Sequence, residues 1–146
     1  MGLAAIKALA EVLRKPIAAV SLLEAVARSG TSRGRVFSVL DAGRGELYVG
    51  DYELGPPVQM HSERLLSREE FFVESKSQLV ITHDANLAEV VGSAGVRVER
   101  IGYPDSGMIA RMGWERIRRG ETILPEELEA NYIRRSDAEI FSKPKL

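Results

Sequence analysis

The chain has 146 residues, 45% of them hydrophobic and 28% charged, and its formal net charge at pH 7 is −1. This length suits one ordinary domain with a real hydrophobic core, and the balanced charge gives no general attraction to nucleic acid or to an anionic membrane. The chain contains no cysteine, which excludes disulfides, thiolate metal ligands and a cysteine nucleophile and fits a cytoplasmic location.

The first segment, 2–14, predicts a helix, because alanine and leucine dominate it and Lys15-Pro16 would end it. Lys7 and Glu11 interrupt its apolar run, so we interpret it as a helix rather than a signal peptide, and no other run reaches the length of a membrane span. The polar residues form one narrow stripe. This helix is therefore apolar on nearly all sides and is expected to have partners on more than one side.

The next segment predicts a short buried strand at 17–21, followed by a helix at 22–28. Ser21 with Glu24 three residues later has the pattern of a capping box, in which the two side chains accept hydrogen bonds from backbone amides at the start of the helix.

Two further runs predict strands: 35–41 is apolar on both faces, and 46–54 alternates between apolar and polar residues. A third antiparallel strand is expected after the Pro56-Pro57 turn. These three strands would form a meander.

The rest of the chain predicts alternating helices and strands. Ser67 with Glu70 indicates a second capping box, and Gly92 and Gly120 are typical helix stops. The expected helices and strands lie in turn at 67–74, 78–82, 84–92, 96–101 and 105–120, and an extended arm and basic tail follow. A three-strand meander followed by alternating helices and strands is the order of a ribonuclease H-like lobe, an α/β domain with a mixed sheet.

The loop between the first two predicted strands begins with Asp41, at a position where nucleotide-binding lobes often place a carboxylate. We favour a tight turn over a catalytic loop: Gly43 and Gly45 supply positive φ, and the carboxylate would accept bonds from the following amides. A phosphate cradle would need glycines that lead into a helix. Arg44 and Glu46 flank the turn and are candidates for a surface pair or a partner contact.

The aromatic and histidine side chains favour structural roles. Tyr48 and Tyr52 lie on one face of their strand and are expected in the core or covering the sheet, because acidic neighbours argue against an RNA-stacking sheet. Trp114 is expected to pack on the sheet. His61 and His83 lack the spacing of a metal-binding pair, so no metal site is predicted.

The end of the chain is locally basic. The functional interpretation is contact with tRNA phosphates or with an acidic partner; the alternative, which we favour, is a solvated helix face and tail. The residues concerned are Arg111, Arg118, Arg119, Arg134, Arg135, Lys143 and Lys145.

Three segments, 2–27, 40–48 and 131–138, resemble the TsaB (YeaZ) family of the actin-like ATPase and glycoprotease superfamily. The second resembles the family's Asp-Ala-Arg-x-Gly-Glu-Val-Tyr motif, with Gly43 where relatives usually have arginine, and the third resembles its Pro-x-Tyr-Leu-Arg close, with Ala130 in place of proline. The signature residues are Asp41, Arg44, Glu46, Tyr48, Tyr132 and Arg134.

The resemblance implies a chain that lacks most of the family's first lobe. The expected division is a helix-strand-helix remnant of that lobe at 1–30, a ribonuclease H-like second lobe at 35–120, and a C-terminal arm and tail at 121–146.

By resemblance, the chain would be a non-catalytic subunit that pairs with a TsaD-like enzyme in threonylcarbamoylation of tRNA adenosine-37. A TsaE-like ATPase would join, and tRNA would be met only indirectly. The expected contact residues of the first helix are Leu3, Ile6, Leu9 and Leu13, whose exposure would also drive self-association.

No metal, cofactor or catalytic residue is predicted, and no Gly-x-Ser-x-Gly elbow supports the peptidase label of the wider family. Two alternatives stay open. One is a small nucleotide-dependent phosphotransferase or hydrolase that uses Asp41, and the other is an inactive, self-associating truncated homologue.

Overall fold

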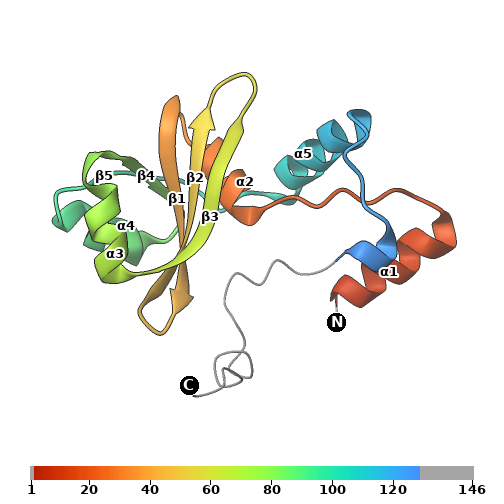
Figure 1. Ribbon diagram of the computed structural model, residues 1–146, viewed down its shortest axis with the longest axis horizontal. Coiled ribbons are helices and arrows are strands. Elements are labelled where there is room, and N and C mark those ends of the chain that lie inside the picture. Colours follow the sequence, from red (N-terminus) through yellow and green to blue (C-terminus); the bar gives the residue numbers. More distant parts are fainter. Residues whose placement is uncertain (1, 129–146) are drawn as a thin grey trace, which may run out of the picture.

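The structure, a computed structural model, describes residues 2–128 (Figure 1). Its centre is a five-stranded sheet in the order β3-β2-β1-β4-β5. The antiparallel pairs are β1 with β2 and β2 with β3, and the parallel pairs are β1 with β4 and β4 with β5. The strands are β1 (Gly34–Gly43), β2 (Glu46–Leu54), β3 (Gln59–Ser67), β4 (Leu79–Thr82) and β5 (Arg97–Arg100). The predicted α/β fold, a meander followed by alternating helices and strands, is confirmed.

The helices of the sheet lobe lie on both of its faces (Figure 1). The helices are α1 (Gly2–Leu13), α2 (Leu22–Ser29), α3 (Arg68–Glu74), α4 (Ala85–Ser93) and α5 (Ser106–Arg118), with single 3-10 turns η1 (Ser75–Ser77) and η2 (Pro125–Glu127). In Figure 1, α1, α5 and η2 lie together on one side of this lobe. The predicted division at 30 and 121 stays a prediction, and the motif residues Tyr132 and Arg134 lie outside the described residues.

Two hydrophobic cores form because successive side chains of a strand point to opposite faces of the sheet. In β1, Phe37 faces the core under α3 and α4, while Val36 faces the core under α2. Tyr48 and Tyr52 both join the α2 core, as predicted for sheet-covering side chains. Burial on both faces explains why three of the four residues 36–39 are apolar. The fourth, Ser38, is also buried.

The close approach of α2 to the sheet depends on a glycine. A Cβ atom on Gly50 would lie 2.5 Å from Tyr52 Cε2, 2.7 Å from Ser38 Oγ and 3.1 Å from Leu23 Cβ. Real Cβ atoms essentially never lie closer than 3.0 Å to another atom, so a side chain here would displace Tyr52 and Ser38, and the glycine lets Leu23 of α2 pack directly on β2.

The two predicted capping boxes have different outcomes. At α3, Ser67 Oγ accepts from the Glu70 amide at 3.2 Å and the Glu70 carboxylate accepts from the Ser67 amide at 2.8 Å, which confirms the prediction. At α2 the prediction of a capping box is wrong, because Ser21 makes no side-chain cap bond. Its hydroxyl donates to Glu63 of β3, and the Glu24 carboxylate pairs with arginines. Hydrogen bonds in which a partner is charged are stronger than bonds between neutral groups, so Ser21 and Glu24 bond to these side chains rather than to the backbone amides of α2.

The predicted buried strand at 17–21 is also wrong. These residues form one isolated antiparallel bridge, in which the Ile123 amide donates to the Ile17 carbonyl at 2.9 Å. No residue of the segment is fully buried. A buried strand needs partners along a whole ladder, and within residues 2–128 the segment pairs at only this one position.

Helix α1 forms where predicted and ends one residue early. Arg14 adopts φ 51°, the Arg14 amide donates to the Glu11 carbonyl and the Lys15 amide to the Ala10 carbonyl. This pair of bonds is a Schellman ending, and Pro16 lies just beyond it. The helix is thus stopped by its own backbone before the proline.

Candidate functional site

The signature turn joins β1 to β2 as a two-residue hairpin. Arg44 has φ 54° and Gly45 has φ 79°, the pair of positive angles that a type I′ turn requires. Gly43, at φ 74°, pairs with Glu46 and closes the loop. The prediction that Gly43 and Gly45 supply positive φ is therefore confirmed, and Arg44 adopts the same unusual region.

The carboxylate of Asp41 is used by this turn. Its Oδ1 accepts from the Gly43 amide at 2.6 Å, and its Oδ2 lies 3.9 Å from Nη2 of Arg68. The side chain is exposed. This carboxylate therefore stabilises the backbone geometry of the turn, as the turn interpretation predicts.

The exposed side of α1 is strongly apolar. Ile6, Leu9 and Leu13 are 55%, 60% and 54% exposed, and Val12 is 79% exposed. Leu3 differs, because it is half-buried on the side of the helix that carries the buried Ala10. Three of the four predicted contact residues thus share a solvent-facing surface, and Val12, which the prediction omitted, belongs with them. We call Ile6, Leu9, Val12 and Leu13 the α1 face.

Few contacts hold α1 to the rest of the protein. It packs against η2, and the Ile17–Ile123 bridge lies just beyond its C-terminal end. Figure 1 shows α1 away from the sheet, connected to α2 by an extended segment. A helix of 12 residues is only marginally stable in isolation. Its exposed leucine, isoleucine and valine side chains are not buried by any part of residues 2–128.

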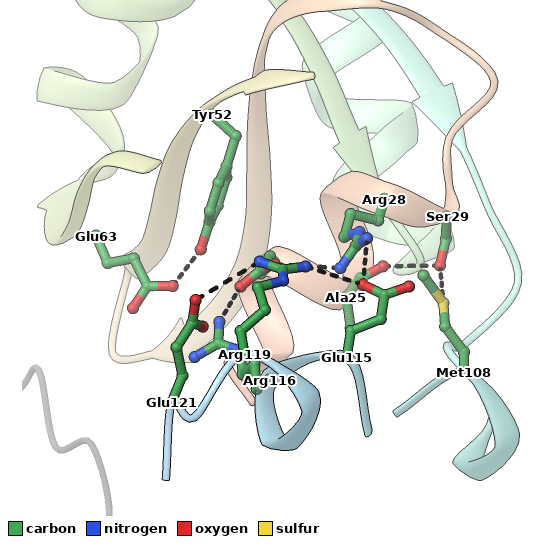
Figure 2. Close-up of polar contacts among 11 residues, drawn as sticks. Ala25, Arg28, Ser29, Tyr52, Glu63, Met108, Glu115, Arg116, Arg119 and Glu121 are labelled. Atoms are coloured by element: carbon green, nitrogen blue, oxygen red, sulfur yellow. Dashed lines mark hydrogen bonds and ion pairs between the residues drawn. The ribbon is translucent and has the colours of Figure 1, made fainter. Parts of the chain in front are cut away.

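A network of charged side chains joins α2 to α5 (Figure 2). Arg116 Nη2 lies 2.5 Å from Glu24 Oε2, and Arg28 Nη2 lies 3.1 Å from Glu115 Oε2. Arg119 adds a pair with Glu115 at 3.5 Å. Among these five side chains every charge has an opposite partner. The network therefore positions α5 and leaves little free charge for a ligand.

Beside this network lies an open cleft of about 470 Å³, between α5 and the loop that joins β2 to β3. Tyr52 lines it and donates its hydroxyl to the Glu63 carboxylate (Figure 2). The same carboxylate also accepts a hydrogen bond from Ser21. Burial, followed by this hydrogen bond, raises the pKa of Tyr52 far above its usual range. The phenol stays neutral at any physiological pH and acts here as a donor that ties β2 to β3 and to Ser21.

The histidines give no metal site. Asp84, next to His83, accepts from the Leu87 amide at 3.0 Å and caps α4. The His83 ring meets Tyr103 edge-on, with ring centres 4.7 Å apart. Residues 2–128 contain no group of three or more histidine or acidic side chains that could hold a metal ion. Within the same range, no helix is long and apolar enough to cross a membrane.

The prediction that Trp114 packs on the sheet is wrong. Its side chain is 61% exposed on α5, and the buried position of that helix is Met112. Residues two positions apart in a helix lie about 200° apart around its axis. The helix therefore cannot bury both Met112 and Trp114 against the same surface.

Comparison with known proteins supports the fold. Residues 1–71, just under half of the chain, match the family model described as TsaD, tRNA N6-adenosine threonylcarbamoyltransferase. A crystal structure of an uncharacterized Pseudomonas aeruginosa protein with similarity to peptidase YeaZ superposes with a TM-score of 0.72 at 22% identity. YeaZ from Pseudomonas aeruginosa gives a TM-score of 0.70, also at 22% identity. No curated protein matches the sequence significantly.

These likenesses cover most of this chain and only part of the other proteins. The match spans 91% and 90% of this chain but 66% of each Pseudomonas chain, slightly less than two thirds. The resemblance to the TsaB (YeaZ) family is therefore confirmed as a likeness of fold, an α/β lobe of the actin-like, ribonuclease H-like kind.

Proposed function

We propose that this chain is a non-catalytic, TsaB-like cytoplasmic subunit that binds a TsaD-like enzyme and supports threonylcarbamoylation of tRNA adenosine-37. The observation that carries the proposal is the α1 face, an apolar surface on a protein with a YeaZ-like fold and a TsaD-family match over its first half. Contiguous exposed apolar surface is typical of protein interfaces.

The α1 face has the composition of an interface centre. Its four members are aliphatic, and the neighbouring exposed positions Ala5 and Ala8 are small enough to let another helix approach closely. Each fully buried leucine, isoleucine or valine contributes about 1.5–3 kcal/mol relative to exposure. Covering this face therefore favours association strongly, even after the cost of lost translational freedom.

The geometry of the turn at Asp41 also agrees with a subunit that has no catalytic activity of its own. Asp41 is exposed and bonded to the Gly43 amide, so nothing observed favours the alternative of a nucleotide-dependent phosphotransferase or hydrolase. The TsaD-like partner would supply the transfer chemistry.

The test is reconstitution with the cognate TsaD-like and TsaE-like proteins. We expect the chain to co-purify with the TsaD-like protein and to increase threonylcarbamoyl incorporation into tRNA. Ile6→Glu should abolish both effects, while Val73→Glu, which alters a similarly exposed apolar residue on α3, should leave them intact. Equal activity with and without the wild-type chain would refute the proposal. Light scattering of the chain alone measures its self-association, which is thereby distinguished from binding to the TsaD-like protein.

A further inference from the structure

Helix α5 presents an aromatic side chain between two arginines. On a helix, residues three and four positions apart are neighbours. Along the axis of α5, Arg111 therefore lies about one turn before Trp114, and Arg118 lies about one turn after it. All three side chains are exposed. Trp114 is the only tryptophan of the chain, and within residues 2–128 its ring contacts no other aromatic ring.

The two arginines differ from the others on this helix. Arg116 pairs with Glu24 of α2 at 2.5 Å, and Arg119, at the end of the helix, pairs with Glu115 and Glu121 at 3.5 and 3.7 Å. Arg111 and Arg118 form no ion pair with any residue in 2–128. The exposed side of α5 therefore carries two arginines that form no ion pair with the described residues, although the net charge of the chain is −1.

An apolar groove begins at the other edge of Trp114. It is open, has a volume of about 340 Å³ and runs between α5 and the segment before α2. Ala18 and Val20 form one wall, and Ile109, Gly113, Trp114 and Ile117 form the other. The indole thus borders apolar surface on one side and guanidinium groups on the other.

We propose that this face of α5 binds single-stranded RNA, with a base stacked on Trp114 at the groove and the neighbouring phosphates on Arg111 and Arg118. Stacking on an exposed aromatic ring with arginines nearby is the usual way in which proteins hold unpaired nucleotides. The proposal deepens the proposed function, because it gives the chain a direct contact with RNA where the family resemblance implied only an indirect one.

RNA fits this face better than an acidic protein does. The carboxylates of an acidic protein would pair with Arg111 and Arg118 but would leave the exposed indole of Trp114 without a stacked planar group, which a nucleotide base supplies. One stacked nucleotide and two phosphates need only the side chains named. Their seven-residue spacing, about 10 Å along the helix axis, leaves room for a base between two phosphate contacts.

The single tryptophan makes the test direct. A short oligouridylate titrated into the full chain at low salt should quench the fluorescence of Trp114 saturably. The affinity should fall with salt with a logarithmic slope of about −1.4, the value for two phosphate contacts on a single strand. The experiment needs no TsaD-like protein, so it can fail or succeed independently of the proposed function.

Variants separate this site from general electrostatics. The double variant R111E/R118E should weaken binding by about tenfold or more. R97E/R100E makes the same change of charge on exposed residues of β5 and should change the affinity by less than about twofold.

The role of stacking is measured by anisotropy of a labelled oligouridylate, with folding checked by circular dichroism. Trp114→Ala should weaken binding by about tenfold, and Trp114→Phe by much less. Absence of saturable quenching, equal losses in the two double variants, or equally tight binding of polyglutamate would overturn the proposal. The last result would indicate an acidic protein partner instead.

Discussion

Glu24 and Arg116 lie 92 residues apart in the sequence, and their side chains meet at 2.5 Å. The same carboxylate pairs with Arg28 at 3.4 Å, and Arg28 reaches Glu115 of α5 at 3.1 Å. Only Met112 of α5 is buried. The position of α5 relative to the sheet lobe therefore depends mainly on charged contacts, which are weaker and more sensitive to salt than apolar packing.

Replacing this carboxylate should loosen α5. Glu24→Gln removes the charge that two arginines share, so we expect faster amide hydrogen exchange in α5 and a loss of about 1–2 kcal/mol in the free energy of unfolding. Glu89→Gln changes an exposed glutamate of α4 that makes no ion pair within residues 2–128 and serves as the control. Identical exchange of α5 in both variants would show that these contacts do not hold the helix.

Crowding at Gly50 predicts a large effect of one methyl group. Gly50→Ala places a Cβ 2.5 Å from Tyr52 Cε2, and overpacking of this kind costs about 1–3 kcal/mol. Gly92→Ala is the matched control, because its Cβ would lie 3.5 Å from Val98 Cγ1 and alanine favours the helix by up to about 1 kcal/mol. Urea unfolding should separate the two variants in opposite directions, and a neutral Gly50→Ala would contradict the packing of α2 described above.

Glu99 predicts part of the response to acid. Burial of its carboxylate opposes ionisation, but hydrogen bonds from Thr31 and Ser32 outweigh that cost and lower the pKa below the usual 4.5. A lowered pKa stabilises the fold fully above the pKa of the unfolded chain. This contribution is lost as the pH falls through the lower pKa of the folded state.

The variant Glu99→Gln tests this sign. It should be less stable than the wild type at neutral pH, and the difference should shrink as the pH falls well below 4.5. Denaturant unfolding at the two pH values measures it. A difference that stays constant with pH would mean that ionisation of Glu99 contributes nothing.

The hairpin gives a test of backbone conformation. Gly45 has φ 79°, so Gly45→Ala should cost about 1 kcal/mol although its Cβ would touch nothing within 4 Å. Gly102 also has open space and lacks a positive φ, so Gly102→Ala should be neutral or slightly stabilising. Thermal unfolding distinguishes the two, and equal melting temperatures would contradict the turn assignment.

The strands and the Asp41 turn could be predicted because their signals are local. Alternation of residues 46–54, the apolar run of β1 and glycines at 43 and 45 each describe one strand or one loop. The capping box at Ser67 succeeded for the same reason. These patterns act within a few residues and need no knowledge of distant parts of the chain.

The errors concern residues whose partners are distant in sequence. Ser21 bonds to Glu63, and Glu24 to Arg116, so a local capping rule could not anticipate either contact. The strand predicted at 17–21 lacked a ladder partner, and Trp114 lies outside the single buried position of α5. Val12 was omitted from the α1 face because the pattern shows that the helix is apolar but not which side the remainder of the protein covers.

The most direct test of the central claim is calorimetric titration of the full chain into the cognate TsaD-like protein. Leu9→Glu places a charge in the middle of the α1 face, and Val73→Glu places the same charge on α3, on the far side of the sheet lobe in Figure 1. We predict saturable binding by the wild type and by Val73→Glu, and an affinity at least about tenfold lower, or about 1.4 kcal/mol, for Leu9→Glu. Wild-type binding that Leu9→Glu leaves unchanged, or no binding by the wild type, would contradict the account.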